Sequence, residues 1–513
     1  MCGITGIWGQ ADNDLVEEMT ERMAHRGPDA RGTFASGAGA LGHCRLSIMD
    51  PQGGDHPIYS DDRSKAIIGN GEIYNYPELR RALAPQVEFH TGCDTESALH
   101  LFETVGTDAA SRLDGMFALA IADGNDLYLA RDPIGIKPLY YSLADGRVVF
   151  ASELKALVGL VDEVSAFPPG SWYHTRYGLR SYYTVPRHQP VDAPPEEHAR
   201  ALRTTLERAV VKRLMSDVPV GAFLSGGLDS SIIAALARPH LDELHTFSVG
   251  FEGSPDLAAA RRVSRVLDTV HHEYVISTDE LLDKLPEIVY HLESYDLDLV
   301  RSAIPCYFTA RLAAEHVKVI LTGEGADELF AGYRYYRDIE DGRRLHDELR
   351  RSVLTLHDVN LQRVDRLTMA HSVEGRVPFL DAEMIELAQR IPPEQKLHRQ
   401  NGDVIEKWIL RTACEGLLPA EIVWRDKAQF DEGSGTVAAL GWTVGRAMTT
   451  GESFEYATGY RDANLRSPEE CFYHKLLREA YGDAEVIFNN VARWAMRPTA
   501  TSSGSQSSYP SSR

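Results

Sequence analysis

The chain has 513 residues, more than one compact core normally holds, so two or three domains are expected. Its 75 acidic residues outnumber its 53 basic ones and leave a formal net charge of −22, which gives no support to a nucleic-acid-binding protein. Neither an apolar run of ~18 residues nor a signal-peptide pattern is present, so we expect no membrane span and a cytoplasmic location.

Cys2 follows Met1 directly and is the first candidate catalytic residue. Removal of the methionine would leave a thiol and a free α-amine on one residue. Because an α-amine titrates near pH ~8, it can accept the thiol proton at neutral pH. The five other cysteines form no C-x-x-C pair, so they are predicted to be reduced and structural, without a zinc site or a disulfide framework.

Alternating β-prone segments separated by Gly and Asp predict antiparallel sheets in the first part of the chain. These segments are residues 66–69, 116–121 and 147–151. Residues 184–197 are rich in Pro, His and Asp, and we predict an interdomain linker at 186–197.

Strand-like and helical segments alternate after the linker and predict an α/β domain with a parallel sheet that binds ligands at the carboxyl ends of its strands. The expected strands are residues 218–224, 245–251 and 317–321, and the expected helices are 196–215, one from Asp229, and 256–267. We place this domain at residues 198–500. The Ser-rich residues 501–513 are predicted to be a disordered tail.

Five motifs lie in order behind Cys2, at residues 25–29, 45–48, 70–75, 91–94 and 131–139. They resemble the glutaminase domain of class II glutamine amidotransferases, which are N-terminal-nucleophile hydrolases. The resemblance implies an α+β sandwich (αββα) over residues 1–185, in which Cys2 attacks the side-chain amide of glutamine, forms a glutamyl thioester and releases ammonia.

The same resemblance assigns the other residues of a glutaminase site. Asn70 and the backbone amide of Gly71 would form the oxyanion hole, where fixed donors face the oxygen that gains charge. Glutamine is a zwitterion, so its head group needs both charges. Arg45 fits the α-carboxylate, and Asp94, with Glu72 nearby, fits the α-ammonium.

A second motif, Leu-Ser-Gly-Gly-Leu-Asp-Ser-Ser at residues 224–231, stands where an apolar strand gives way to a helix. Gly226 and Gly227 allow a tight turn, while Ser225, Ser230 and the helix N-terminus offer donors to a phosphate. The Gly-Lys-Ser/Thr ending of a Walker A loop is absent. The string resembles the loop of ATP-pyrophosphatases, which cleave ATP between its α and β phosphates.

Further motifs at residues 245–251, 321–329, 374–381 and 424–430 extend the likeness. With the glutaminase motifs they resemble the glutamine-hydrolysing asparagine synthetases over about the first 435 residues. The resemblance implies that the nucleotide is bordered by Leu224, Val249, Thr322 and Gly323. It also implies that Asp229 and Asp327 hold Mg²⁺, that Lys427 stabilises phosphate charge, and that Glu324 positions or deprotonates ammonia.

The family chemistry implied is attack of a carboxylate on the α-phosphorus of MgATP, giving an acyl-adenylate and pyrophosphate. Ammonia from Cys2 then reaches the adenylate through a shielded channel. Relatives in the family suggest a homodimer, and neither nucleic acid nor a membrane is an expected partner.

The default acceptor is aspartate, but residues 295–301 depart from the family pattern. Arg301 is kept and is predicted to bind the acceptor carboxylate, whereas Asp298 and Leu299 replace two threonines. Another negative charge beside a dianionic substrate is unfavourable unless it is paired or turned away. Aspartate and a different carboxylate of a specialised biosynthetic pathway therefore both stay open as acceptors.

Two other functions compete. A β-lactam synthetase-like cyclase would share the ATP chemistry but would not need the complete set of Cys2, Arg45, Asn70 and Asp94. A nonenzymatic nucleotide or glutamine sensor would need binding residues only, whereas catalytic candidates are present in both domains.

Overall fold

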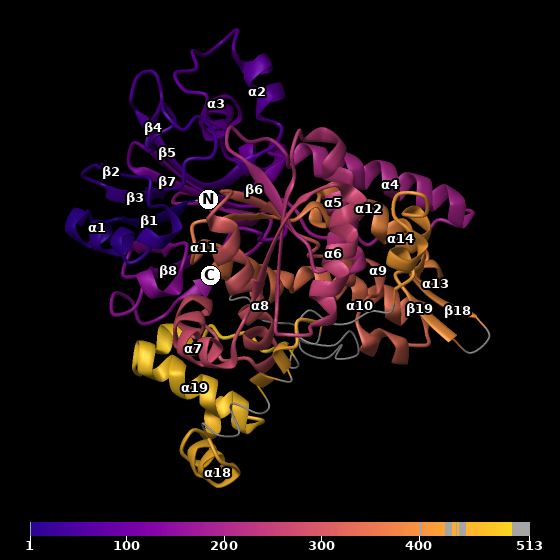
Figure 1. The fold of residues 1–513 in the computed structure, drawn as a ribbon. Helices are drawn as coiled ribbons and strands as arrows, with labels where there is room; N and C mark the ends of the chain where they lie inside the picture. Colours follow the sequence, from indigo (N-terminus) through magenta and orange to yellow (C-terminus); the bar gives the residue numbers. More distant parts are fainter. Residues whose placement is uncertain (1, 401–402, 426–432, 438, 441–447, 495–513) are drawn as a thin grey trace.

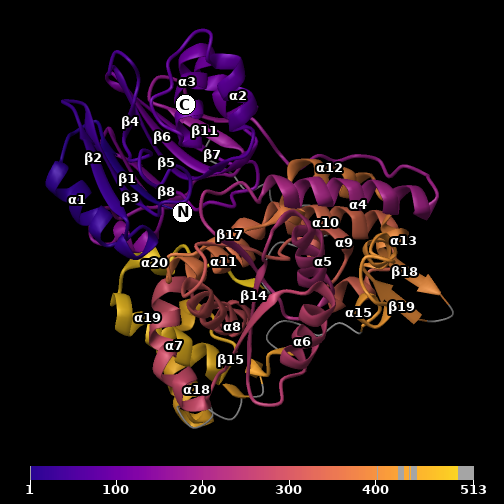
Figure 2. The ribbon, with the colours of Figure 1, turned by 45° about the horizontal axis from the view of Figure 1, so that its top comes forward.

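The computed structural model describes residues 2–400, 403–425, 433–437, 439–440 and 448–494. The first ~180 residues form one lobe, drawn in indigo and violet, and the rest of the described chain forms a second lobe beside it (Figures 1 and 2). None of the helices in these ranges combines the length and apolar character needed to cross a bilayer.

Two antiparallel sheets form the centre of the first lobe. One runs in the order β10-β8-β9-β1-β3-β2 and the other in the order β12-β11-β7-β6-β5-β4. The first sheet contains β1 Gly3–Trp8, β2 Ala30–Ala35, β3 Gly39–Arg45, β8 Tyr140–Ala144, β9 Arg147–Ala151 and β10 Ser165–Ala166. The second contains β4 Ile58–Tyr59, β5 Lys65–Ile73, β6 Gly115–Asp123, β7 Asp126–Arg131, β11 Ser171–His174 and β12 Gly178–Ser181.

The two sheets stack face to face, and helices cover their outer faces. On β5, Ile68 packs with Ile4 and Leu41 between the sheets, while its neighbour Ile67 packs with Leu99 under the helices, as the two-residue period of a strand requires. The helices are α1 Asn13–Glu21, α2 Tyr76–Leu83 and α3 Asp94–Val105. This arrangement confirms the predicted αββα sandwich.

The second lobe contains a five-stranded parallel sheet in the order β15-β14-β13-β16-β17. The strands are β13 Val220–Phe223, β14 His245–Gly250, β15 Val270–Val275, β16 Val319–Leu321 and β17 Glu374–Arg376. The chain leaves β13 toward β14 on one side and later returns to β16 on the other. The carboxyl ends of β13 and β16 thus border a crevice, which is where α/β sheets bind ligands.

Helices and one small antiparallel hairpin surround this sheet. The helices are α4 Pro195–Lys212, α5 Leu228–Ala237, α6 Pro255–Leu267, α7 Thr278–Leu292, α8 Leu297–Ala314, α9 Ala326–Phe330, α10 Gly342–Leu354, α11 Asn360–Met369, α12 Ala382–Arg390, α13 Pro393–Lys396, α14 Trp408–Ala413, α15 Ala420–Val423, α18 Thr450–Gly459, α19 Pro468–Tyr481 and α20 Glu485–Phe488, and the hairpin is β18 Leu397–Gln400 with β19 Asp403–Glu406. The predicted parallel α/β domain is confirmed.

Residues 182–194, between β12 and α4, contain no helix or strand. They are nevertheless attached to the second lobe, because the Val191 amide donates to the Arg390 carbonyl at 2.7 Å and Arg350 donates to the Val185 carbonyl. The predicted linker at 186–197 overlaps this segment, although α4 begins at Pro195. The predicted tail at 501–513 lies outside the described residues.

Buried charges join the two lobes. Arg26 contacts Glu153 of its own lobe at 2.6 Å and Asp365 of α11 at 2.7 Å, while Arg366 of α11 lies 3.6 Å from the same Glu153. All of these side chains are fully or almost fully buried. Removing one partner of such a pair leaves an uncompensated charge in the interior, so the network holds the lobes in one relative position.

Candidate active sites

Cys2 lies in a small pocket of about 20 Å³ in the first lobe. The pocket is also bordered by the candidate residues Arg45, Gly71, Glu72 and Asp94. Cys2 is 9% exposed, and burial raises the pKa of its thiol. The thiol therefore needs a base to become a nucleophile, which is the task expected of the α-amine.

Asn70 is placed where an oxyanion-hole residue is needed. The backbone nitrogen of Cys2 donates to Oδ1 of Asn70 at 3.2 Å. Nδ2 of Asn70 is buried and has no hydrogen-bond partner among the described residues. A buried unpaired donor is costly, so one that lies beside a nucleophile fits an amide held ready for a developing negative charge.

Gly71, the next residue of β5, has a backbone conformation that only glycine adopts readily. Its φ is +137°, and a Cβ atom would lie 1.9 Å from the Met116 carbonyl oxygen of the neighbouring strand β6. Any larger residue would force the two strands apart beside Cys2.

The two ends of the pocket carry opposite charges. Arg45, at the end of β3, donates to Asp55 at 2.7 Å and to the carbonyl oxygens of Met49 and Asp50 at 3.0 and 2.7 Å. These contacts fix its guanidinium against the loop that follows β3.

Two buried carboxyl groups lie on the other side. Asp94 begins α3 and accepts from the Ile73 amide at 2.5 Å, yet burial raises its pKa to about 6. Burial and the nearby Asp94 also raise the pKa of Glu72, which contacts Arg376 at 3.2 Å. Both groups would gain from a bound cation, as the α-ammonium of glutamine would provide.

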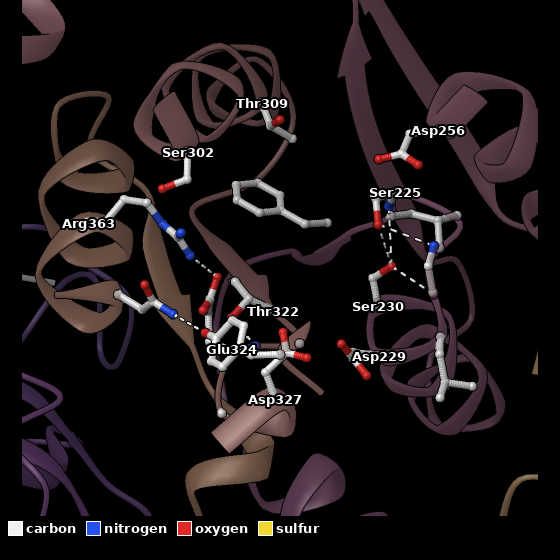
Figure 3. Close-up of a pocket in the computed structure, with 18 of the residues that line it drawn as sticks. Ser225, Asp229, Ser230, Asp256, Ser302, Thr309, Thr322, Glu324, Asp327 and Arg363 are labelled. Atoms are coloured by element: carbon white, nitrogen blue, oxygen red, sulfur yellow. Dashed lines mark hydrogen bonds and ion pairs between the residues drawn. The ribbon is translucent and has the colours of Figure 1, made fainter. Parts of the chain in front are cut away.

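A larger cavity of about 450 Å³ opens at the carboxyl ends of β13, β14 and β16 (Figure 3). The cavity is lined by the described residues predicted for the nucleotide, the metal ion and ammonia, except Gly226, namely Leu224, Ser225, Gly227, Asp229, Ser230, Val249, Thr322, Gly323, Glu324 and Asp327. Lys427 lies outside the described residues.

Gly226 has φ +70°, and a Cβ atom there would lie 2.5 Å from the backbone of Ala259. Position 226 therefore requires glycine for the chain to make this turn.

The loop between β13 and α5 has the structure of an anion site. Ser225 Oγ and Ser230 Oγ lie 3.2 Å apart, and Ser225 Oγ accepts from the Gly227 amide at 3.2 Å. Helix α5 begins at Leu228, and no side chain caps it at Gly227. Its first amides and the positive end of its dipole are therefore available to a phosphate.

Asp229 and Asp327 face each other across the cavity, and Lys407 joins them (Figure 3 shows the two carboxylates). Lys407 Nζ lies 2.5 Å from Asp229 Oδ2 and 2.6 Å from Asp327 Oδ1. Burial alone would lower the pKa of Lys407, but the two carboxylates raise it above its usual value, so the ammonium stays charged. Lys407 was not identified from the sequence, because it follows β19 and lies far from either aspartate in the chain.

The same carboxylates fit Mg²⁺. Oδ1 of Asp229 is buried and unpaired within the described structure. Such an oxygen suits a hard cation, which prefers carboxylate ligands. Glu324 forms an ion pair with Arg363, and burial raises the pKa of Glu324 against the effect of that arginine (Figure 3).

Comparison with known proteins identifies the family of both domains. Residues 1–174 match the glutamine amidotransferase domain model, and residues 201–344 and 337–496 match the asparagine synthase model. "Asparagine synthetase [glutamine-hydrolyzing] 3" of Arabidopsis thaliana is 41% identical over 459 residues, covering 85% of this chain and 79% of that protein. The enzyme of the same name from Zea mays is 38% identical over 508 residues, covering 93% and 86%.

The chain belongs to the glutamine-hydrolysing asparagine synthetase family. It is therefore an enzyme of the ligase class, with a glutaminase domain followed by a synthetase domain.

One segment of this family member differs from the expectation for its acceptor site. Asp298, Leu299 and Ser302, on the first turns of α8, line the cavity, but Arg301 does not. Nε and Nη2 of Arg301 donate to the two carboxylate oxygens of Glu469 on α19, at 2.8 and 2.7 Å. A bidentate pair of this kind occupies the fork that would bind a substrate carboxylate.

Other cationic side chains line the cavity and were not identified from the sequence, among them Arg334, Arg363 and Arg425. Arg425 donates to the Gly226 carbonyl at 3.0 Å and to Asp256 at 3.1 Å. It thus lies against the phosphate loop. Arg425 stands in the motif at residues 424–430, but no role was assigned to it, and Arg334 and Arg363 belong to none of the motifs.

Proposed function

We propose that this chain synthesises asparagine from aspartate, using glutamine as the nitrogen donor and ATP as the activating substrate. The main observation behind the proposal is that one chain carries two sites. One is the Cys2 pocket, which is bordered by Arg45 and Asp94, and the other is the cavity next to the loop between β13 and α5. The names of the family members similar to it support asparagine as the product.

In the glutaminase site, Arg45 and Asp94 hold the head group of glutamine, and the Cys2 thiol transfers its proton to the α-amine as its sulfur attacks the side-chain amide. The oxygen that becomes negative is stabilised by Nδ2 of Asn70 and the Gly71 amide. The C–N bond then breaks, ammonia leaves, and water hydrolyses the remaining thioester to glutamate.

In the synthetase site, an oxygen of the acceptor carboxylate attacks the α-phosphorus of ATP, and the bond to the pyrophosphate breaks. The loop at residues 224–227 and the first amides of α5 hold the phosphates, while Lys407 and Arg425 supply positive charge near them. Asp229 and Asp327 would hold Mg²⁺, which neutralises phosphate charge when bound.

Activation is needed because a free carboxylate has no leaving group that ammonia could displace. The acyl-adenylate provides AMP as that leaving group. Glu324 then accepts a proton from the attacking ammonia, and the raised pKa of this buried carboxyl and its ion pair with Arg363 support that role. Asparagine, AMP and pyrophosphate are the products.

A second candidate acceptor follows from α8. Asp298 and Leu299 border the cavity where hydroxyl side chains are expected, and Arg301 is bound to Glu469. These two observations are the basis for the second candidate, a carboxylate other than aspartate. The complete glutaminase pocket does not favour a β-lactam synthetase-like cyclase, which makes no use of glutamine.

Pyrophosphate release with a panel of carboxylates, in the presence of glutamine and MgATP, tests the acceptor. We expect aspartate to give the fastest release and asparagine to be detected by mass spectrometry. If another carboxylate is preferred and Asp298→Thr with Leu299→Thr improves asparagine yield, the second candidate is correct. Release without any carboxylate would contradict both.

A further inference from the structure

Three histidines from different elements meet on one face of the parallel sheet. His245 begins β14, His272 lies in β15, and His316 lies between α8 and β16. One ligand-capable nitrogen from each of them lies within 4.8 Å of the other two. None of the three lines the nucleotide cavity or the Cys2 pocket.

The register of the sheet explains the first two positions. His245 pairs with Val270, and Phe247 pairs with His272. Because alternate residues of a strand point to the same face, the side chains of these four residues lie on one face of the sheet. His316 joins them from the end of α8, which packs on this face. The rings of His272 and His316 are 3.8 Å apart at their centroids.

One ring nitrogen of His245 points at His272, while the other contacts a carboxylate. Its Nε2 lies 2.8 Å from the Glu243 carboxylate, and its Nδ1 lies 2.9 Å from Nε2 of His272. When Nε2–H of His245 donates to Glu243, Nδ1 carries the lone pair. A carboxylate that holds the far nitrogen of an imidazole is the usual outer partner of a metal-binding histidine.

His316 is able to complete the set. Its side chain is exposed, and within the described part of the chain its ring nitrogens make no hydrogen bond or ion pair. Zn–N bonds of about 2.0–2.1 Å in tetrahedral geometry place ligand nitrogens ~3.3 Å apart, so the present spacing requires only a small turn of this exposed ring. The buried Phe247, which stacks on His272 and His316, provides an apolar wall.

We propose that His245, His272 and His316 form a binding site for a late first-row divalent metal ion such as Zn²⁺. Imidazole nitrogens select Zn²⁺, Cu²⁺ or Ni²⁺ over Mg²⁺, so the ion that accompanies ATP does not compete for the site. Solvent takes the remaining coordination position beside the exposed His316. The proton on Nε2 of His272 moves to its Nδ1 through water, and all three ligands stay neutral.

The bound ion would fasten the starts of β14 and β15 to the loop before β16. An ion that binds the folded chain and not the unfolded chain stabilises the fold. The site is independent of the proposed amidation, and its consequence is a metal-dependent increase in the stability of the synthetase domain.

Calorimetric titration of the full chain, without a histidine tag and after treatment with EDTA, tests the proposal with Zn²⁺ as the probe. We expect one ion to bind per site, with an affinity at least ~10-fold weaker in His316→Gln. His240→Gln removes a histidine outside the cluster and should bind as the wild type does. Zn²⁺ should also raise the unfolding temperature of the wild type and of His240→Gln, but not that of His316→Gln.

The Cys2 thiol is the main competing ligand, and Co²⁺ distinguishes it. Cobalt bound by nitrogen shows visible d–d bands, whereas cobalt bound by a thiolate adds a strong near-ultraviolet charge-transfer band. Nitrogen-type bands that disappear in His316→Gln support the site. Thiolate bands, equal Zn²⁺ affinity in wild type and His316→Gln, or no binding in the wild type would each overturn it, leaving the three histidines as packed rings without a metal ion.

Discussion

Arg376 of the synthetase domain contacts Glu72 of the glutaminase pocket, with 3.2 Å between Nη2 and Oε1. The same guanidinium binds Glu374 at 2.6 Å, and the carbonyl oxygen of Arg376 accepts from the amide of Thr322, which lines the nucleotide cavity. Arg376 thus contacts one residue that lines the Cys2 pocket and one residue that lines the nucleotide cavity. The two sites are held in a fixed relation by a fully buried side chain rather than by a surface contact.

Replacing this arginine should destabilise the protein strongly. Arg376→Met leaves Glu72 and Glu374 buried without their cation, a loss we place at about 3–5 kcal/mol. The shift in the midpoint of urea-induced unfolding measures it. Arg208→Met, which removes an exposed pair with Glu383, is the matched control and should cost less than ~1 kcal/mol. Equal shifts in the two variants would refute the role of Arg376.

Glutamine use should weaken in mild acid because of Asp94. Burial raises the pKa of this carboxyl to about 6, and only its ionised form attracts the α-ammonium of glutamine. As the pH falls through about 6, Asp94 becomes protonated, so kcat/KM for glutamine should decrease. Asp94→Asn should lower kcat/KM at neutral pH and remove this acidic limb. A wild-type profile that stays flat down to pH ~5 would exclude Asp94 from the head-group site.

Lys407 should be required for the ATP half-reaction only. Lys407→Met removes the ammonium that lies between Asp229 and Asp327. The two carboxylates and the phosphates then lose that positive charge, so AMP formation should fall about 10²-fold or more with either nitrogen source. Glutamine hydrolysis, measured as glutamate release, serves as the internal control and should be retained. Normal AMP formation would show that the lysine is only a structural bridge between the two aspartates.

Cys2→Ala should separate the two activities. Glutamine-dependent amide formation requires the thiol and should be lost, whereas ammonium-dependent formation uses only the synthetase cavity and should persist. Product analysis with each nitrogen source makes the comparison. Equal loss of both activities would mean that Cys2 does more than release ammonia from glutamine.

The sequence predicted the features that depend on neighbouring residues. The strand at residues 147–151 matches β9. The motif at residues 224–231 begins directly after β13 and ends in the first turn of α5, as expected, because its apolar run, glycines and serines are contiguous. The predicted strand at 218–224 is shorter in the structure, Val220–Phe223.

Other features depend on tertiary packing and could not be predicted in this way. Lys407 meets Asp229 across 178 positions of sequence, and Arg301 pairs with Glu469 across 168. A charged residue considered alone gives no sign of its partner. Arg301 is the residue to which the family resemblance assigned the substrate carboxylate. Because its guanidinium is paired with Glu469, the acceptor site differs from that expectation.

Transfer of nitrogen from glutamine to asparagine is the most direct test of the proposed function. Glutamine labelled with ¹⁵N in its side-chain amide is supplied with aspartate and MgATP, and the products are measured by mass spectrometry. We predict ¹⁵N-asparagine with AMP formed in equal amount. Hydrolysis of glutamine and ATP without labelled asparagine would contradict the account.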